Sequence, residues 1–206
     1  MNLDTDKLVE EAELLAEGRH GKILYIDHDD IELILKQQKH EKATTMIHKE
    51  WIFTKKAYNA GVAPKPLLLD KKNNVFIREY VRGARLEYVV KMNKQDTSYL
   101  QRLFESILDM CRSLENKKIY KPELTYPRKD ILVTKNDTPV FIDFERCTVS
   151  DKNKNVTQFA QYILRCDHVL PTKNEKEKVY ELGKEYAHSP TQETYNAFKM
   201  HLLSLL

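Results

Sequence analysis

The stretch DILVTKNDTPVFIDFE, residues 130–145, carries the pattern that decides the fold. Two apolar runs, 131–133 and 140–142, flank an Asn-Asp pair, and this order is typical of an antiparallel β-hairpin. Such a hairpin brings the start of one strand beside the end of the other, so Asp130 and Asp143 are predicted to converge at one rim. Two carboxylates at one place, with phosphate oxygens completing the shell, suit Mg²⁺. The hairpin therefore predicts a site for magnesium and phosphate.

A lysine and a glutamate upstream fit the same chemistry. Lys36 ends an apolar strand predicted over residues 31–36, where its ammonium would leave the sheet toward a cleft. Glu50 lies among apolar residues in a helix predicted over 42–60, where its carboxylate would hold Lys36 toward phosphate oxygens. A lysine that snorkels to solvent and a solvated helical glutamate stay open as alternatives for each residue taken alone.

The short segment EGRHG, residues 17–21, precedes a strand predicted over 22–27. Its two glycines, Gly18 and Gly21, permit a backbone that approaches phosphate groups closely. The same spacing also occurs in ordinary turns, which stay the alternative.

The remaining pattern predicts an α+β chain of two lobes. Helices are predicted over 5–16, 42–60, 96–115, 155–166, 174–187 and 190–206, the last with Ser189 as its cap. Antiparallel hairpins are predicted over 22–36, 67–81 and 131–142. A strand-rich segment, 1–83, therefore precedes a helix-rich segment, 84–206.

Composition narrows the class of protein. The 206 residues include 34 Lys and Arg against 31 Asp and Glu, and a net charge of +3 is too small to indicate a nucleic-acid or membrane-surface protein. Hydrophobic residues, at 41%, suffice for a core without any run long enough to cross a bilayer. The three cysteines are scattered and form no CxxC pair, which argues against a disulfide framework or a zinc site. We therefore expect a soluble cytoplasmic protein without a nucleic-acid or membrane partner.

The order of these motifs resembles the protein-kinase-like superfamily. It runs from the Gly-x-x-Gly loop, the strand lysine and the helical glutamate to IREYVRG (77–83), DILV (130–133) and IDFE (142–145). Small members without a long activation segment, namely the RIO-type kinases and the short predicted Ser/Thr kinases of archaea and bacteria, are nearest in outline. The resemblance covers about residues 14–165. It implies a bilobal kinase fold, with a strand-rich N-lobe, a reduced helical C-lobe and ATP between the lobes.

The resemblance also implies how the nucleotide would be held. Gly18 and Gly21 would lie in the phosphate loop, and Lys36 would touch the α- and β-phosphates with Glu50 as its partner. Backbone groups of the segment from Glu79 to Val81 would form the hinge that meets the adenine.

The C-lobe would supply the metal ligands and the general base. Asp143 would match the metal-binding aspartate of the Asp-Phe-Gly motif, and Asp130 would take the position of the catalytic-loop asparagine. The chain departs from the kinase pattern five residues before Asp130, where Thr125 cannot replace a carboxylate. A loop two residues longer would bring Glu123 into the place of the base.

The expected activity is transfer of the γ-phosphoryl of Mg-ATP to a protein Ser or Thr, the chain's own residues included. No Ala-Pro-Glu motif follows Asp143, so a full peptide-docking lobe is not expected. Two alternatives stay open: a small-molecule kinase of the aminoglycoside or sugar type, and a pseudokinase that binds nucleotide without turnover.

Overall fold

The computed structural model describes residues 4–18, 21–38, 44–127, 129–152 and 154–206. It is a mixed structure of helices and antiparallel strands, in agreement with the expected α+β class. The chain divides into two compact units, residues 1–82 with 142–147, and residues 83–141 with 148–206. The break after residue 82 falls beside the expected boundary at 83. The segment 142–147, which was expected in the second lobe, instead groups with the first unit.

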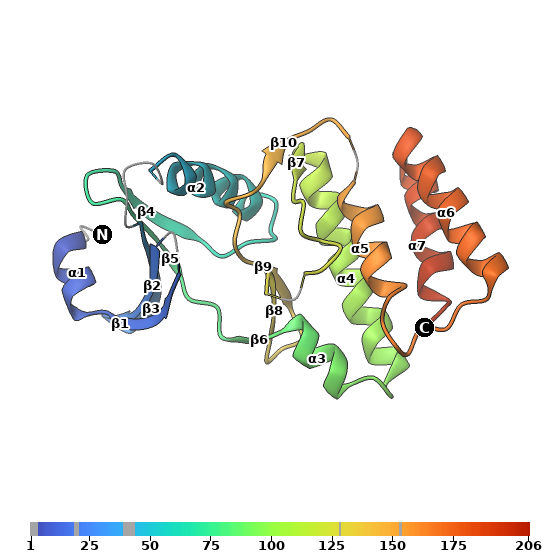
Figure 1. Cartoon of the computed structure of the whole chain (residues 1–206), viewed down its shortest axis with the longest axis horizontal. Helices are drawn as coiled ribbons and strands as arrows, with labels where there is room; N and C mark the ends of the chain where they lie inside the picture. Colours follow the sequence, from blue (N-terminus) through green and yellow to red (C-terminus); the bar gives the residue numbers. More distant parts are fainter. Residues whose placement is uncertain (1–3, 19–20, 39–43, 128, 153) are drawn as a thin grey trace. The chain divides into compact units, whose positions relative to one another are not determined.

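The first unit is built on a five-stranded antiparallel sheet with the strand order β1-β2-β3-β5-β4 (Figure 1). Its described elements are α1 (Thr5–Glu11), β1 (Glu13–Glu17), β2 (Gly21–His28), β3 (Ile31–Gln38), α2 (Thr44–Tyr58), β4 (Pro66–Asp70) and β5 (Val75–Glu79). The two predicted hairpins of this region are confirmed. Asp29 and Asp30 both have positive φ, 52° and 61°, so the β2–β3 connection is a tight two-residue turn whose twist matches that of the strands.

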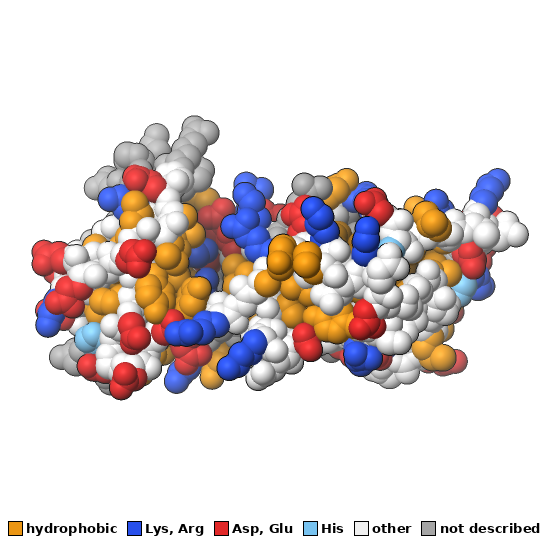
Figure 2. Space-filling model, turned by 90° about the horizontal axis from the view of Figure 1, so that it is seen from below, with side chains coloured by type: hydrophobic (Ala, Val, Ile, Leu, Met, Phe, Trp, Pro, Cys, Tyr) orange, Lys and Arg blue, Asp and Glu red, His pale blue; other side chains and the backbone are white. Residues whose placement is uncertain are grey.

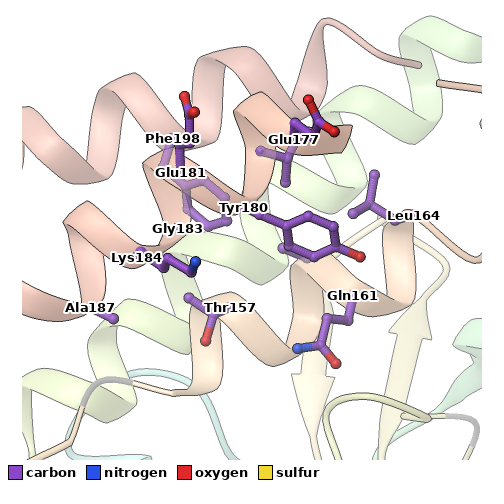
Figure 3. Close-up of a pocket in the computed structure, with 12 residues that line it drawn as sticks. Thr157, Gln161, Leu164, Glu177, Tyr180, Glu181, Gly183, Lys184, Ala187 and Phe198 are labelled. Atoms are coloured by element: carbon purple, nitrogen blue, oxygen red, sulfur yellow. The ribbon is translucent and has the colours of Figure 1, made fainter. Parts of the chain in front are cut away.

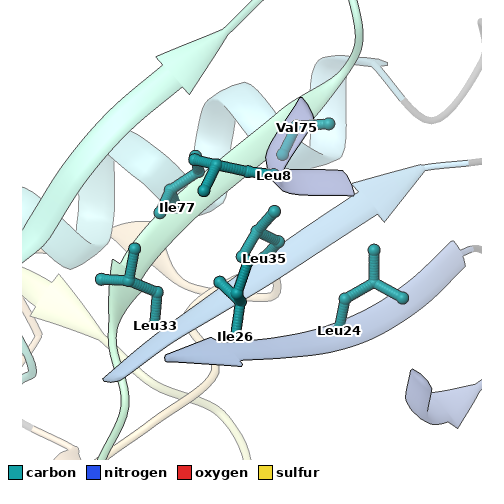
Figure 4. Close-up of a cluster of buried hydrophobic side chains, with 7 residues drawn as sticks. All are labelled: Leu8, Leu24, Ile26, Leu33, Leu35, Val75 and Ile77. Atoms are coloured by element: carbon teal, nitrogen blue, oxygen red, sulfur yellow. The ribbon is translucent and has the colours of Figure 1, made fainter. Parts of the chain in front are cut away.

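The two faces of this sheet carry different side chains because residues alternate along each strand. One face forms the apolar cluster shown in Figure 4, with Leu8 of α1 packed on it. The other members are Leu24, Ile26, Leu33, Leu35, Val75 and Ile77. The opposite face lies under α2, where the rings of Trp51 and Phe76 pack edge to face with their centroids 5.6 Å apart. Lys36 is paired with Phe76 and therefore points toward α2.

The helix predicted over 5–16 is wrong in its second half. α1 ends at Glu11, Ala12 is extended with ψ 140°, and residues 13–17 form β1. Leu14 pairs with Leu24 and Ala16 with Ile23, with an irregularity between the two pairs. The gain from adding an edge strand to the sheet overrides the helical spacing of the apolar residues.

The second unit is mainly helical and contains two small antiparallel sheets. Its described elements are β6 (Gly83–Arg85), α3 (Leu86–Met92), α4 (Thr97–Asn116), β7 (Ile119–Tyr120), β8 (Ile131–Thr134), β9 (Pro139–Phe141), β10 (Thr148–Val149), α5 (Asn155–Ile163), α6 (Lys173–His188) and α7 (Gln192–Leu203). The predicted 131–142 hairpin is confirmed, with Ile131 opposite Phe141. The sequence did not predict β6, α3, β7 and β10, which are too short to show a period.

The long helix α4 organises this unit. Its apolar stripe is buried as predicted, and its N-cap Asp96 accepts a hydrogen bond from Tyr99 N at 2.9 Å. The helices α5 and α7 pack on α4, and α6 packs on α7. The buried carboxylate of Glu115 joins these helices, because it accepts hydrogen bonds from the Tyr186 hydroxyl and, at 3.0 Å, from Val156 N.

The start of the last helix differs from the prediction. Thr191, rather than Ser189, is the N-cap, and its side chain forms a reciprocal capping box with Thr194. Ser189 instead ends α6, where its N–H donates to Glu185 O at 2.8 Å.

The surface agrees with the small net charge. The face shown in Figure 2 carries both acidic and basic side chains. Among the described residues, no helix combines the length and the apolar character needed to cross a membrane.

Candidate functional site

The central feature of the first unit is a buried ion pair between a strand and a helix. The Lys36 ammonium on β3 donates to the Glu50 carboxylate on α2. The side chain of Glu50 is 4% exposed and that of Lys36 is 14% exposed. Burial by itself would lower the pKa of Lys36, but the charges of Glu50 and Asp143 outweigh it and raise that pKa above its usual value. Lys36 is therefore held as a cation at neutral pH.

Asp143 adds a second carboxylate to this lysine. Its Oδ1 lies 3.6 Å from Lys36 Nζ, although more than a hundred residues separate the two along the chain. The backbone of Asp143 has φ 68°, a left-handed conformation that an L-residue adopts at a cost. A strained backbone beside a charged group is a frequent mark of a functional site, because it fixes where the carboxylate points.

A third carboxylate, that of Glu145, completes an acidic group. The carboxylate oxygens of Glu50, Asp143 and Glu145 lie within 4.8 Å of one another. Burial raises the pKa of Glu145, and the negative charges of Asp143 and Glu50 raise it further. Oxygen donors of this kind fit Mg²⁺, which is bound through one or two carboxylates together with phosphate oxygens and water.

The raised pKa of Glu145 predicts a pH-dependent effect of removing its charge. A folded state that binds this proton more tightly than the unfolded chain is destabilised once the pH exceeds the ordinary glutamate pKa. Glu145→Gln is therefore expected to melt at a higher temperature than the wild type at pH 7, in buffer without divalent cations. The difference should shrink as the pH falls through the raised pKa toward 4.

The control for this measurement is Glu10→Gln, which removes an exposed glutamate of α1. It is expected to leave the melting temperature nearly unchanged at both pH values. A Glu145→Gln variant that melts below the wild type at pH 7 would show that the neighbouring carboxylates do not repel Glu145.

Arg78 is a member of this site that the sequence analysis missed. On β5 it pairs with Ile34, so it lies on the same face of the sheet as Lys36 and diagonal to it. It is 7% exposed, its Nη1 donates to Glu79 O at 2.8 Å, and its buried Nε has no hydrogen-bond partner among the described residues. Burial lowers the pKa of Arg78, whereas Glu50 and Asp143 oppose that change. The signal for it was an arginine that directly follows the apolar residues Val75, Phe76 and Ile77 in a predicted strand.

The glycine-bearing segment lies at the same site. Gly18 N donates to Gly21 O at 2.9 Å, which closes the connection from β1 to β2. A Cβ at Gly21 would lie 2.2 Å from Gln37 O, so close packing on β3 requires a glycine there. The predicted loop residues Arg19 and His20 lie outside the described residues. Glycine at 21 therefore has a structural reason that does not depend on phosphate.

A cavity of about 280 Å³ connects these groups within the first unit. Its lining includes both glycines and the charged group Lys36, Glu50, Asp143 and Glu145. Sequence reasoning thus placed Gly18, Gly21, Lys36, Glu50 and Asp143 in one site, and the structure brings all of them to one cavity.

The segment expected to be the hinge is tied to the sheet. Glu79 N donates to Lys65 O at 3.0 Å and Tyr80 N donates to Glu32 O at 2.9 Å. The Glu32 carboxylate also accepts hydrogen bonds from Arg82 and, at 2.6 Å, from the Tyr25 hydroxyl. Two of the three backbone donors predicted for the nucleotide base are thus already used, and Val81 would have to supply the N–H.

The second unit holds a separate charged group around Lys121. This lysine side chain is buried, and its Nζ lies 3.9 Å from Glu123 Oε2 and 3.9 Å from Asp130 Oδ2. One ammonium therefore spans the candidate base and the candidate metal ligand. Glu123 is 30% exposed and Asp130 is 14% exposed, so both carboxylates still reach the surface. The sequence analysis singled out both acids but gave Lys121 no role.

The predicted convergence of Asp130 with Asp143 stays a prediction. Asp130 directly precedes β8 in the second unit, whereas Asp143 follows β9 in the first unit. The acidic group found among the described residues of the first unit contains Asp143 with Glu50 and Glu145.

Comparison with known proteins identifies no family for this chain. No protein-family model matches the chain, and no curated protein sequence matches it. The resemblance to kinase-like proteins therefore stays a prediction from the order of the residues along the chain.

Proposed function

We propose that the chain is an ATP-dependent phosphotransferase of the protein-kinase-like type, which transfers the γ-phosphoryl of Mg-ATP to a Ser or Thr hydroxyl. The observation that carries the proposal is the triad of Lys36, Glu50 and Asp143. A strand lysine contacts both a helical glutamate and an aspartate that follows a distant hairpin, beside a glycine-bearing connection. A buried lysine with two carboxylates suits the binding of a phosphate chain and its metal ion.

Each residue would have a definite task in this activity. Lys36 would bind phosphate oxygens, and Glu50 would fix the direction of its ammonium. Asp143, with Glu145 beside it, would hold Mg²⁺, which neutralises charge on the phosphates when it is bound. Glu123 would accept the proton of the attacking hydroxyl.

The altered catalytic loop distinguishes two alternative functions. Thr125 stands where kinases carry a catalytic aspartate, and Glu123 is the substitute. A pseudokinase, which binds nucleotide and regulates a partner without turnover, would need the triad but not the base. A small-molecule kinase of the aminoglycoside or sugar type would need both, with a hydroxylated metabolite as the acceptor.

Stabilisation by nucleotide tests the proposal first. ATP with Mg²⁺ at about 100 times its dissociation constant is expected to raise the free energy of unfolding by ~2.7 kcal/mol, or the melting temperature by roughly 5–10 °C. ATP without Mg²⁺ should give a smaller shift, because Asp143 and Glu145 repel bare phosphates. Asp143→Ala is expected to abolish the part of the shift that depends on magnesium.

Asp27→Ala provides the matched control, since Asp27 is an exposed aspartate of β2 in the same unit. This variant should respond to Mg-ATP as the wild type does. A wild-type protein whose melting temperature does not change with any nucleotide would contradict both the phosphotransferase and the pseudokinase. A shift without release of γ-phosphate to any hydroxyl acceptor would leave the pseudokinase as the better description.

A further inference from the structure

A second cavity lies in the second, mainly helical unit. It has a volume of about 550 Å³ and lies among α5, α6 and α7 (Figure 3). The helix packing explains why space is left there. α5 packs on α4, while α6 packs on α7. The α5 wall and the α6 wall of the cavity therefore belong to different packed pairs of helices.

Small and apolar residues form one part of this cavity. Ala160 and Leu164 come from α5 and its end, Gly183 comes from α6, and Phe198 comes from α7. Gly183 is buried, and a Cβ there would lie 3.3 Å from Phe198 Cε2. Glycine inside a helix costs about 1 kcal/mol relative to alanine, so close packing of Phe198 rather than helix stability accounts for this residue.

Lys184 also lines the larger cavity, and two further cations lie beside it. An adjoining cavity of about 330 Å³ shares Gln161, Leu164 and Tyr180 with the first and adds Arg165 and Lys176. A guanidinium, an ammonium, an amide and a phenol thus line this adjoining cavity. The guanidinium of Arg165 also donates to Thr125 O at 3.4 Å and lies 4.7 Å from the centroid of the Tyr126 ring, contacts that help to hold it in place. Groups of this kind bind a carboxylate or a phosphate through charge-assisted hydrogen bonds.

The two acids that also line the larger cavity are engaged on their own helix. Glu177 lies 3.7 Å from Lys173, and Glu181 lies 3.4 Å from Lys178. In Figure 3 their carboxylates lie on the opposite side of Tyr180 from Gln161. Each of these two acids therefore has a lysine of α6 as its ion-pair partner.

We propose that the larger cavity, with the adjoining one, binds a small amphipathic anion, whose aliphatic body lies on Ala160, Leu164 and Phe198 and whose anionic head meets Arg165 and Lys176. The volume falls within the range of about 300–1,000 Å³ that is usual for small-molecule sites, which favours a single ligand over a docked protein segment. The head is a carboxylate or a phosphate, and the experiment separates the two. This proposal does not rest on the phosphotransferase activity.

Calorimetric titration of the full chain tests it with decanoate below the concentration of micelle formation. Decanoate is expected to bind at one site, and octanoate to bind roughly tenfold more weakly, since each buried methylene contributes about three- to fourfold in affinity. Decanol and decyltrimethylammonium are expected to bind at least tenfold more weakly than decanoate, because they lack the negative head. Titration with decyl phosphate shows which of the two anionic heads binds more tightly.

Two variants test where the ligand binds. The double variant Arg165→Glu, Lys176→Glu changes exposed residues and is expected to weaken decanoate binding at least tenfold without loss of the fold. Ala187→Phe, also at an exposed lining position, is expected to weaken it by occupying the larger cavity. The control is Lys91→Glu, Lys117→Glu, which changes the net charge equally at exposed positions that line neither cavity.

The outcomes are distinct. Loss of affinity in both test variants, with the control like the wild type and all melting temperatures retained, supports the site. The proposal is overturned if decanoate does not bind, if decanol or the cationic amphiphile binds as tightly, or if the charge reversal leaves the affinity unchanged.

Discussion

Replacing Glu50 with alanine is expected to lower the free energy of unfolding by about 3–5 kcal/mol. The carboxylate is 4% exposed and accepts from Lys36, and Arg78 lies on the same face of the sheet. Removal leaves the largely buried Lys36 and the buried Arg78 without their most buried carboxylate, although Asp143 still lies 3.6 Å from Lys36. Chemical denaturation at pH 7, with ΔG extrapolated to water, measures the loss.

A double variant separates charge from packing. Lys36→Met with Glu50→Leu removes both members of the pair and keeps similar side-chain volumes. Replacing a buried ion pair by apolar residues is often neutral or stabilising, so we expect this protein to recover most of the stability lost in Glu50→Ala. It should nevertheless fail to respond to Mg-ATP, because the proposed phosphate ligand is gone.

Comparison of the two results distinguishes a structural pair from a functional one. A stable double variant that still shifts with Mg-ATP would remove Lys36 from the nucleotide site. A double variant as unstable as Glu50→Ala would show that the charges are required by the fold itself, for example to compensate Arg78.

Local signals predicted most of the first unit. The β2–β3 and β4–β5 hairpins follow from turn residues and apolar runs that act over a few positions. The same holds for the end of α2 at Tyr58, shortly before Gly61, which has φ 75°. The positions of Lys36 and Glu50 could also be predicted, because the periods of a strand and of a helix define which side chains share a face. β1 was missed, since its pairing with β2 is a tertiary effect that the helical spacing of its residues hides.

The parts of the site that sequence reasoning missed depend on contacts across longer distances. Arg78 is buried only because β5 lies inside the sheet, beside β3. Glu145 was not predicted to belong to the site, and its place beside Glu50 and Asp143 follows from how residues 142–147 join the first unit. Lys121 is a lysine in an irregular segment, and nothing in the neighbouring sequence indicates that it is buried.

Lys121→Met is expected to have the largest effect in the second unit. The lysine is 0% exposed and lies 3.9 Å from each of two carboxylates, so its loss leaves like charges close together. We expect the free energy of unfolding to fall by about 2–3 kcal/mol, less than for a fully buried pair because Glu123 and Asp130 reach the surface. Asp130→Asn alone should lower the free energy of unfolding by less than Lys121→Met does. The double variant Lys121→Met, Asp130→Asn should be more stable than Lys121→Met, with a coupling energy between the two substitutions of about 1 kcal/mol or more.

The same variants distinguish positioning from simple support of the fold. If Lys121 holds Glu123 where it accepts the hydroxyl proton, turnover in Lys121→Met should fall about 100-fold or more even at a temperature where the protein is fully folded. The thermal shift with Mg-ATP should be retained, because Lys36 and Asp143 of the first unit are untouched. A variant that is folded, binds Mg-ATP and turns over at the wild-type rate would remove both Lys121 and the proposed position of Glu123 from the mechanism. Retained binding with turnover absent in both proteins would instead support the pseudokinase, since the Lys121 ion pairs would then serve only the stability of the second unit.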